Sequence, residues 1–297
     1  MSTMNGKVVL ITGGARGIGA EVARRLRREG AKLVLTDLDA APLEALVAEL
    51  GGEEGAIGVL ADVCDLASME AAVAQGVERF GGIDVVVANA GIASYGSVLQ
   101  VDPATFRRVL DVNVVGVFHT VRAALPSIIE RRGYVLVVSS LAAYTASPGL
   151  AAYHASKAGA EYFANTLRLE VAHHGVDVGS AHMAWIDTPL VQDAKADLPS
   201  FSKMLKVLPG PFGKTTTVEA CGKRFVAGIE KRRNRINVPG WVGALRWVRP
   251  FVQTPLAERD VRRAVPVLLP QMDAEVAALG RSQSARSEAL AHEGTPA

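Results

Sequence analysis

Short apolar runs alternate with helical patterns along the first two thirds of the chain. The apolar runs are rich in valine, leucine and isoleucine, and they lie at 7–12, 32–36, 56–61, 84–89, 134–139 and 176–180. Unbroken apolar runs of this length are typical of parallel strands that are covered on both faces. Helical patterns lie between them, at 19–28, 42–50, 68–80, 103–130 and 152–171. The alternation predicts an α/β fold with one doubly wound parallel sheet, which binds its ligand at the carboxyl ends of the strands.

The pattern changes after about residue 188. Residues 189–214 contain four prolines and predict a loop-rich segment, followed by a helix at 218–230 and an edge strand at 235–238. Residues 241–280 combine tryptophan and phenylalanine with many arginines, and 281–297 are polar and rich in small residues. We therefore expect one Rossmann-type domain at 1–240, a C-terminal helical extension at 241–280 and a disordered tail at 281–297.

Composition narrows the class of protein. The 297 residues are 49% hydrophobic and 21% charged, which is typical of a soluble domain with a sizeable core. A net charge of only +2 gives no reason to expect a nucleic-acid partner. Cys64 and Cys221 lie far apart, so we expect neither a disulfide framework nor a metal site, and a reducing cytoplasm fits. We expect no targeting segment and no membrane span.

A glycine-rich turn follows the first predicted strand. Gly13, Gly17 and Gly19, with Arg16 and Ile18 between them, stand where a helix begins. Glycines there allow a tight turn and a close backbone approach to a pyrophosphate, which the N-terminus of the helix attracts. A glycine-rich turn can also serve the fold alone.

The second strand ends at Asp37, 18 positions after Gly19, where a ribose-binding carboxylate is expected. A carboxylate there accepts hydrogen bonds from ribose hydroxyls and repels a 2′-phosphate, so Asp37 favours NAD over NADP. Arg16 is the counter-signal, because its charge could meet a 2′-phosphate.

Tyr153 and Lys157 have the i, i+4 spacing that places two side chains on one helix face. A phenol with a pKa near ~10 is a poor base at neutral pH, and a neighbouring ammonium stabilises its ionised form. The pair therefore suits proton transfer to and from a substrate oxygen. Taken alone, the spacing is common by chance, and a structural tyrosine is the default interpretation.

Several motifs in one order resemble the short-chain dehydrogenase/reductase family across residues 4–240. They are the turn at 12–19, Asp37, Ala61-Asp62-Val63, Asn89-Ala90-Gly91, Asn113, Ser139-Ser140 and Tyr153 to Lys157. The resemblance implies an oxidoreductase that interconverts a secondary alcohol and a carbonyl by hydride transfer with NAD(H). NADPH-dependent carbonyl reduction, or a non-catalytic nucleotide-binding or membrane-docked protein on the same fold, are the alternatives.

The resemblance also implies residue roles. Asp62 and Val63 would bind the adenine, and Asn89, Ala90 and Gly91 would pack along the cofactor. Ser140 would hydrogen-bond the substrate oxygen, Tyr153 would exchange its proton, and Lys157 would also hold the nicotinamide ribose. Asn113 would either satisfy a helix distortion or hold a water for proton relay. Homodimers or homotetramers would form through 103–130 and 152–171.

One segment departs from the family pattern. Met183 and Ala184 replace the usual Pro-Gly pair, whereas Ile186 and Thr188 keep the positions that contact the carboxamide of the cofactor. This leaves the local loop path open. Apolar residues at 189–214 suggest a bulky lipid-, steroid- or retinoid-like substrate, or simply packing of the domain edge. The basic and aromatic extension suggests either a solvated charged face or peripheral docking on a membrane.

Overall fold

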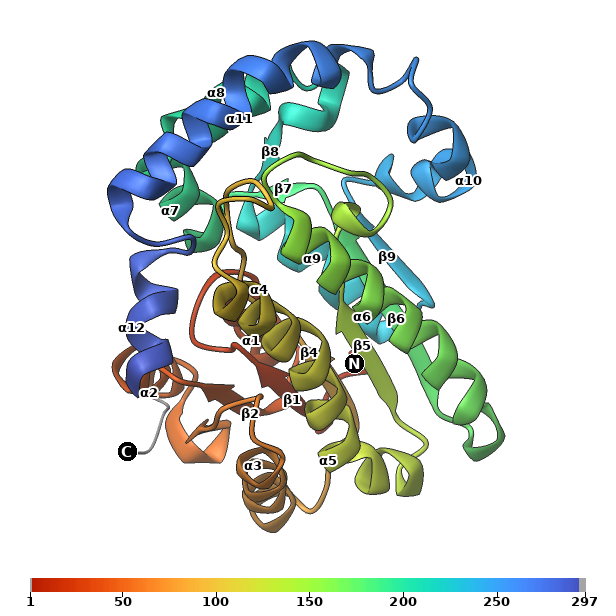
Figure 1. Cartoon of the computed structure of the whole chain (residues 1–297). Helices are drawn as coiled ribbons and strands as arrows, with labels where there is room; N and C mark the ends of the chain where they lie inside the picture. Colours follow the sequence, from red (N-terminus) through yellow and green to blue (C-terminus); the bar gives the residue numbers. More distant parts are fainter. Residues whose placement is uncertain (1, 294–297) are drawn as a thin grey trace.

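Seven parallel strands form the central sheet, in the order β3-β2-β1-β4-β5-β6-β9 (Figure 1). The computed structural model describes residues 2–293. The strands are β1 (Val8–Thr12), β2 (Lys32–Asp37), β3 (Ala56–Leu60), β4 (Val85–Ala88), β5 (Tyr134–Val138), β6 (Asp177–Met183) and β9 (Arg235–Val238). β1, β4 and β5 are buried at every position, which explains their unbroken apolar sequence.

Helices cover both faces of the sheet and bury two large apolar clusters against it. One face carries α1 (Gly17–Arg28), α2 (Ala40–Glu49) and α9 (Val218–Glu230); the other carries α3 (Leu66–Phe80), α4 (Pro103–Leu110), α5 (Gly116–Glu130) and α6 (Ala151–Glu170). The predicted doubly wound sheet is confirmed. The chain leaves β3 at one edge and re-enters as β4 beside β1, so the strand order reverses between β1 and β4. Ligands of this architecture bind at that switch point.

The helix expected at 103–130 is continuous but changes its winding near the middle. Asp102 caps its start by accepting a hydrogen bond from the Thr105 N–H at 3.0 Å, and Pro103 occupies the first turn. A π-helical turn, Asp111–Val115, separates α4 from α5. Within the described residues this is the one helix long and apolar enough to cross a membrane, but half of its most apolar stretch is buried. It packs against α3 and α6, so it belongs to the core.

The loop-rich segment expected at 189–214 is largely helical, and that prediction was wrong. α7 (Pro189–Asp197) and α8 (Pro199–Val207) each begin with a proline. Proline is well tolerated at the first helical position because the N–H that it lacks would have no partner in the helix. Two of the four prolines therefore mark helix starts. A two-stranded ladder, β7 (Trp185–Ile186) with β8 (Thr215–Thr216), brackets the segment.

The C-terminal extension contains α10 (Val242–Val252) and α11 (Arg259–Leu279), and α12 (Ala285–Glu293) follows within the expected tail. α11 lies over α8 and buries Met272 and Val276 in a third apolar cluster (Figure 1). The disorder expected from residue 281 is wrong for 281–293. Ser282 to Ser284 are buried, and the Ser282 carbonyl accepts a hydrogen bond from the Tyr95 N–H at 2.7 Å. Backbone pairing thus orders a polar segment. Residues 294–297, also in the expected tail, lie outside the described residues.

Candidate active site

The carboxyl ends of β1 and β4 border an elongated groove of about 280 Å³. Gly13 and Gly17 line it with positive φ angles of 59° and 53°. A Cβ on Gly13 would lie 2.9 Å from the Ala90 Cα, so only glycine fits there. The Asn89 side chain fixes the turn by donating to the Thr12 and Gly13 carbonyls, each at 3.0 Å. The turn delivers the unpaired N–H groups of the α1 N-terminus to the groove, as a bound pyrophosphate requires.

Three buried polar atoms in this groove have no hydrogen-bond partner within residues 2–293. They are the Arg16 Nε, the Thr36 Oγ1 and the Arg108 Nε. A buried polar group without a partner is costly, so such atoms are expected where a polar ligand completes the structure. A glycine cradle and unsatisfied polar atoms together fit a dinucleotide.

Asp37 lies at the end of β2 and lines the groove, as predicted for a ribose-binding acid. Its Oδ2 accepts a hydrogen bond from the Ala15 N–H at 3.0 Å, and its Oδ1 accepts one from the Leu38 N–H at 2.9 Å. Arg16 forms an ion pair with Asp39. The positive charge that could have met a 2′-phosphate is therefore already compensated, by a carboxylate that the sequence analysis did not consider.

The expected adenine-binding residues Asp62 and Val63 border the same groove, as do Asn89, Ala90 and Gly91. The Asp62 Oδ1 accepts a hydrogen bond from the Cys64 N–H at 2.8 Å, which fixes the carboxylate. The Val63 carbonyl lies 2.9 Å from the His119 Nδ1. Arg108 also lines the groove and was missed, because nothing in its sequence context distinguishes it from a surface arginine on α4. The individual roles of these residues stay predictions.

The first turns of α6 place Tyr153 and Lys157 beside the end of β5. The Lys157 Nζ donates a hydrogen bond to the Val138 carbonyl at 3.0 Å and lies 5.7 Å from the centroid of the Tyr153 ring. The Ser139 hydroxyl donates to the Lys157 carbonyl at 2.8 Å, so this serine is engaged by the backbone of α6. The helix is thus fastened to the strand at the position of the proposed proton-transfer pair.

Burial shifts both members of the pair. It raises the pKa of the Tyr153 phenol, while the hydrogen bond from Ser140 acts in the opposite direction. It lowers the pKa of Lys157 to about 8. Both shifts favour the neutral forms, as expected for groups removed from water.

Asn113 occupies the π-helical turn, so the helix distortion considered for it is present. Its Oδ1 accepts a hydrogen bond from the Ile92 N–H, and its Nδ2 donates to the Ile92 carbonyl and the Ser156 hydroxyl, all at 2.9 Å. A Cβ on Gly91 would lie 3.1 Å from the Asn113 Oδ1 and 3.2 Å from the Lys157 Nζ. Asn113 and Lys157 therefore meet at the loop that follows β4. The water-holding role stays a prediction.

Ser140 follows β5, and its Oγ lies 3.4 Å from the Met183 carbonyl and accepts a hydrogen bond from the Ala142 N–H at 3.1 Å. Met183 and Ala184 do not divert the loop from the groove. Downstream, the Thr188 N–H donates to the Ile186 carbonyl at 2.7 Å, and a Cβ on Gly17 would lie 3.4 Å from the Thr188 methyl group. Thr188 thus returns to the glycine turn.

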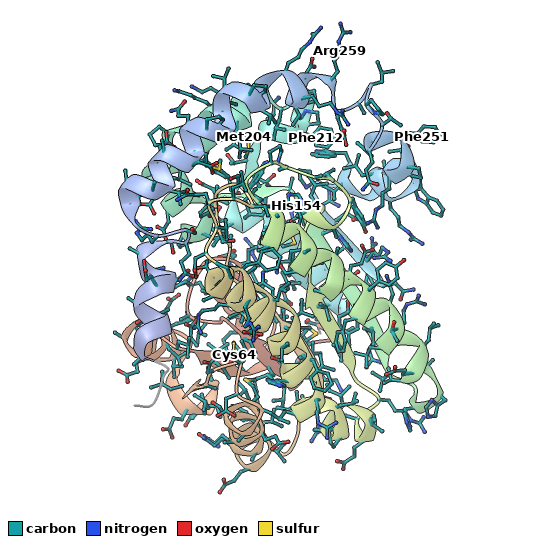
Figure 2. The ribbon with its side chains drawn as sticks, viewed as in Figure 1. Cys64, His154, Met204, Phe212, Phe251 and Arg259 are labelled. Atoms are coloured by element: carbon teal, nitrogen blue, oxygen red, sulfur yellow. The ribbon has the colours of Figure 1, made fainter. Side chains whose placement is uncertain are left out.

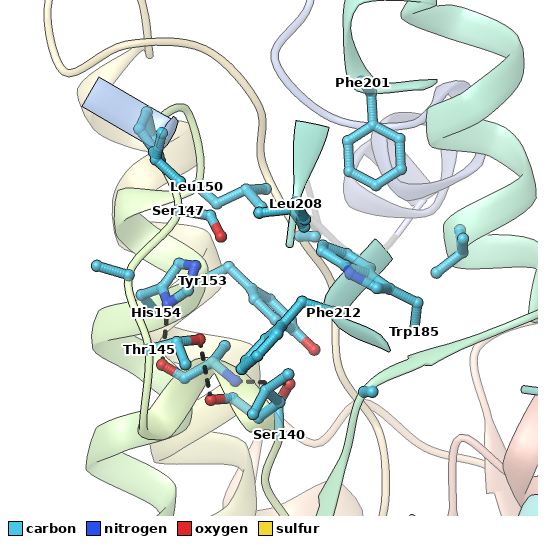
Figure 3. A pocket seen from close by; sticks show the side chains of 18 of the residues that line it. Ser140, Thr145, Ser147, Leu150, Tyr153, His154, Trp185, Phe201, Leu208 and Phe212 are labelled. Atoms are coloured by element: carbon cyan, nitrogen blue, oxygen red, sulfur yellow. Dashed lines mark hydrogen bonds between the residues drawn. The ribbon is translucent and has the colours of Figure 1, made fainter. Parts of the chain in front are cut away.

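A second, mostly apolar cavity of about 560 Å³ adjoins the groove (Figure 3). Trp185, Phe201 and Leu208 line it on the side of α8, whereas Phe212, which packs against Trp241, lies beside Tyr153 and Ser140. The two cavities share Ile18, Tyr153, Met183, Thr188 and Leu190 in their linings.

The extension also contributes to this cavity, which the sequence analysis missed. Val252 from α10, and Val261 and Val265 from α11, line it. The i, i+4 spacing of the two valines predicts an apolar face on this helix. It does not predict that this face lines the cavity. His154 lines it too; its Nδ1 lies 2.9 Å from the Ala142 carbonyl, and burial lowers its pKa.

Comparisons with known proteins agree with this geometry. The family model described as short chain dehydrogenase matches residues 7–199. An uncharacterized NAD-dependent oxidoreductase of Mycobacterium tuberculosis is 36% identical over 218 residues, covering 68% of this chain and 78% of the relative. The (−)-trans-carveol dehydrogenase of Rhodococcus erythropolis is 37% identical over 210 residues, covering 65% and 76%.

Among solved structures, a 3-ketoacyl-(acyl-carrier-protein) reductase from Brucella melitensis, complexed with NADH, superposes with a TM-score of 0.71 at 29% identity. The match covers 79% of this chain and 97% of that one. The family match, the order of the motifs and the shared fold lead to one conclusion. This chain belongs to the short-chain dehydrogenase family of oxidoreductases.

Proposed function

We propose that this protein interconverts a secondary alcohol and a carbonyl with NAD(H), on a hydrophobic substrate. One observation carries the proposal: Tyr153 lines both cavities, whereas Ser140 lines only the apolar one and Lys157 only the groove. A phenol at this junction can reach a substrate oxygen on one side while an ammonium acts on it from the other. A non-catalytic nucleotide-binding protein has no need of such an arrangement.

The bound nicotinamide supplies the acceptor or donor of the hydride. The protein's own residues hold the reacting oxygen and move its proton. The Ser140 and Tyr153 hydroxyls bind the substrate oxygen, and in oxidation the Tyr153 Oη takes its proton. The Lys157 ammonium favours the phenolate, against the burial that raises the pKa of Tyr153. A substrate that fills the apolar cavity would exclude water, which strengthens these electrostatic interactions.

NAD(H) is the cofactor that the groove favours. Asp37 presents a carboxylate at the end of β2, and Arg16 is engaged by Asp39. A relative from Mycobacterium tuberculosis is named an NAD-dependent oxidoreductase, and the similar reductase from Brucella melitensis was solved with NADH. Both observations support NAD(H) over NADP(H).

The size and lining of the apolar cavity support a bulky substrate. Its volume of about 560 Å³ lies within the range of drug-sized ligand sites, roughly 300–1,000 Å³. Aromatic and aliphatic side chains dominate its wall, and hydroxyl groups gather at the junction (Figure 3). A lipid-, steroid- or retinoid-like alcohol or ketone suits this distribution, with its carbonyl carbon at the polar end.

The central test replaces Tyr153 by Phe. Turnover would be followed by nicotinamide absorbance with a panel of hydrophobic secondary alcohols and ketones, and NADH binding by fluorescence titration. Tyr153→Phe should abolish turnover yet bind NADH as the wild type does. Tyr162→Phe, on an exposed position of the same helix, is the matched control. Normal turnover in Tyr153→Phe would remove the phenol from its proposed role.

We also infer a homodimer built from α5 and α6. Phe118, Tyr162 and Leu169 are exposed apolar or aromatic residues on these helices. Exposed apolar residues that gather on neighbouring helices suit burial against a second copy, unlike isolated ones elsewhere on a surface. Leu169→Lys should shift the mass measured by light scattering toward the monomer, whereas Leu60→Lys, an exposed leucine on β3, should not. Equal masses for both variants would argue against this interface.

A peripheral membrane contact is a second candidate property, favoured by the exposed face of the extension. Trp247, Phe251 and Leu256 are 75%, 71% and 80% exposed. Phe251 and Arg259 project outward at the end of the molecule that α10 and α11 form (Figure 2). Val252 and Ala257, their neighbours in sequence, line the apolar cavity. Aromatic side chains flanked by arginines suit an anionic lipid surface, which would then face the entrance for an apolar substrate.

Co-sedimentation with vesicles of phosphatidylserine and phosphatidylcholine tests this contact. The wild type should bind at low salt, and the double variant Trp247→Ser/Phe251→Ser should lose most of that binding. Leu99→Ser, an exposed leucine outside the extension, is the control and should bind normally. No sedimentation of the wild type at low salt would end the proposal.

A further inference from the structure

The polypeptide that follows α11 returns to the dinucleotide groove. Gly280, with a φ of 66°, turns the chain at the end of α11, and α12 then descends beside α7 toward α2 (Figure 1). Arg281 is anchored to Asp197, the last residue of α7, by an ion pair of 2.8 Å. The hydrogen bond from the Tyr95 N–H to the Ser282 carbonyl fixes the segment to the loop after β4 as well.

Through these anchors the segment faces the groove rather than solvent. Ser284, Arg286, Ser287 and Leu290 line the groove, as do the glycine turn and Asp193 of α7. Arg286, Ser287 and Leu290 share one face of α12, and all three are half-buried. The groove thus has a wall that lies beyond the part of the chain matched by the family model, which ends at residue 199.

The charges along the groove indicate what Arg286 contributes. Asp37, Asp62 and Asp193 bring three carboxylates, and Arg16 is compensated by its ion pair with Asp39. Without Arg286, only Arg108 and Lys157 oppose those carboxylates, and Lys157 lies at the Tyr153 end. A dinucleotide adds two phosphate charges. Among the described side chains, no carboxylate lies within ion-pair distance of Arg286, so its guanidinium is available to a ligand.

We propose that residues 281–290 complete the cofactor site and that Arg286 binds the pyrophosphate of NAD(H). This rests on the proposed function, since it assigns a further residue to the same cofactor. The guanidinium donates to phosphate oxygens from α12, so the phosphates are bound by both a helix N-terminus and a cation. Because α12 forms part of the groove wall, its contacts with the cofactor should slow dissociation of the cofactor.

Equilibrium binding tests the assignment without turnover. NADH, NADPH, ADP-ribose and adenosine would be titrated into the full-length wild type, Arg286→Ala and the control Arg263→Ala, an exposed arginine of α11 outside both cavities. A lost hydrogen bond to a charged group corresponds to roughly tenfold to hundredfold weaker binding. Arg286→Ala should show this loss for NADH and ADP-ribose, but not for adenosine, which lacks phosphate. Its NADH affinity should also depend less on salt.

A chain that ends after Ser284 tests the role of α12, because it keeps the anchors at Arg281 and Ser282 and removes α12 together with residues 294–297. The dissociation rate of NADH, measured by stopped-flow fluorescence, should rise at least about tenfold. Circular dichroism would verify the fold of each variant.

Three results would overturn the assignment. They are unchanged NADH affinity in Arg286→Ala, an equal loss for adenosine, or a larger loss for NADPH than for NADH, which would place Arg286 at the 2′-position instead. A wild type that binds no NADH would contradict the proposed function itself, whereas the three results above leave that function intact.

Discussion

The side-chain amide of Asn113 pairs with both backbone groups of Ile92, accepting from the N–H and donating to the carbonyl, each at 2.9 Å. Asn113 is fully buried in the π-helical turn, and its third hydrogen bond reaches the Ser156 hydroxyl. One side chain therefore holds the loop after β4 against α6. This loop carries Gly91 into the groove and Ala93 and Tyr95 into the apolar cavity.

Asn113→Ala should destabilise the protein, because it leaves the Ile92 backbone groups without their partners. A buried group that loses its hydrogen bond costs about 1–3 kcal/mol, and we expect a total of roughly 2–4 kcal/mol in the free energy of unfolding by urea. Asn234→Ala, at an exposed position before β9, should change it by less than about 0.5 kcal/mol. Equal stability of the two variants would show that the pairing contributes little.

The sheet could be predicted because strands that are buried on both faces have apolar residues at successive positions. Runs such as 134–139 therefore stand out in the sequence, and the motifs that follow β1, β2, β4 and β5 lie at adjacent strand ends because of the parallel topology. The residues expected at the site consequently line the groove or the adjoining cavity, except Gly19 and Asn113, which line neither. Their individual chemical roles stay predictions.

What the sequence could not indicate depends on contacts between distant segments. Pro189 and Pro199 read as breaks, although each starts a helix. The segment at 281–290 has no apolar pattern that would predict structure. It is ordered instead by a backbone hydrogen bond from Tyr95 and an ion pair with Asp197. Arg286 therefore had no recognisable signal in sequence, since only the path of the folded chain brings it to the groove.

The preference for NAD(H) should depend on two aspartates that act differently. We expect the Asp37 carboxylate in the groove to repel a 2′-phosphate, and Asp39 to keep Arg16 from binding one. The double variant Asp37→Ser/Asp39→Asn removes the repulsion and frees a guanidinium, so the ratio of NADPH to NADH affinity should rise at least about tenfold. Fluorescence titration with both cofactors measures the ratio.

Asp39→Asn alone should give a smaller change, since Asp37 stays charged. Glu44→Gln, an exposed position on α2, should leave the ratio unchanged and serves as the control. If the wild type already bound NADPH better than NADH, Asp37 would not have the part assigned to it.

Lys157 should give the stability of the protein a dependence on alkaline pH. Burial lowers its pKa from 10.5 to about 8, so between these values the unfolded chain binds a proton that the folded protein does not. The contribution of Lys157 to the free energy of unfolding is therefore lowest below about pH 8. It rises between about pH 8 and 10.5 and reaches its full value above pH 10.5. The total amounts to about 3 kcal/mol.

The measurement compares Tyr153→Phe with Tyr153→Phe/Lys157→Met, so that ionisation of the phenol does not contribute. Denaturant unfolding from pH 7 to 10.5 should show a difference in free energy that is constant up to about pH 8 and then grows in favour of the lysine. A difference that stayed constant over the whole range would mean that Lys157 titrates normally in the folded protein.

A buried ion pair behind Ser140 should matter more to stability than the surface pairs do. Arg235 donates to Glu161 at 3.0 Å and also to Ser180 and Asn165, and both charged side chains are largely buried. His182 lies 3.1 Å from this arginine and 3.3 Å from the Ser140 carbonyl; burial, with a smaller effect of Arg235, lowers its pKa to about 3. The histidine is therefore neutral, and Glu161 is the carboxylate that compensates Arg235.

Glu161→Gln retains the shape of the side chain but leaves that guanidinium without a counter-charge. Breaking a buried pair in this way costs about 3–5 kcal/mol, and because Arg235 is partly exposed we expect about 3 kcal/mol in urea unfolding. Glu49→Gln breaks the exposed pair with Arg24 and should cost at most about 1 kcal/mol. Because the pair lies behind Ser140, Glu161→Gln should also lower kcat at temperatures where the variant is still folded. A cost no larger than that of Glu49→Gln would show that water reaches Arg235 and replaces the carboxylate.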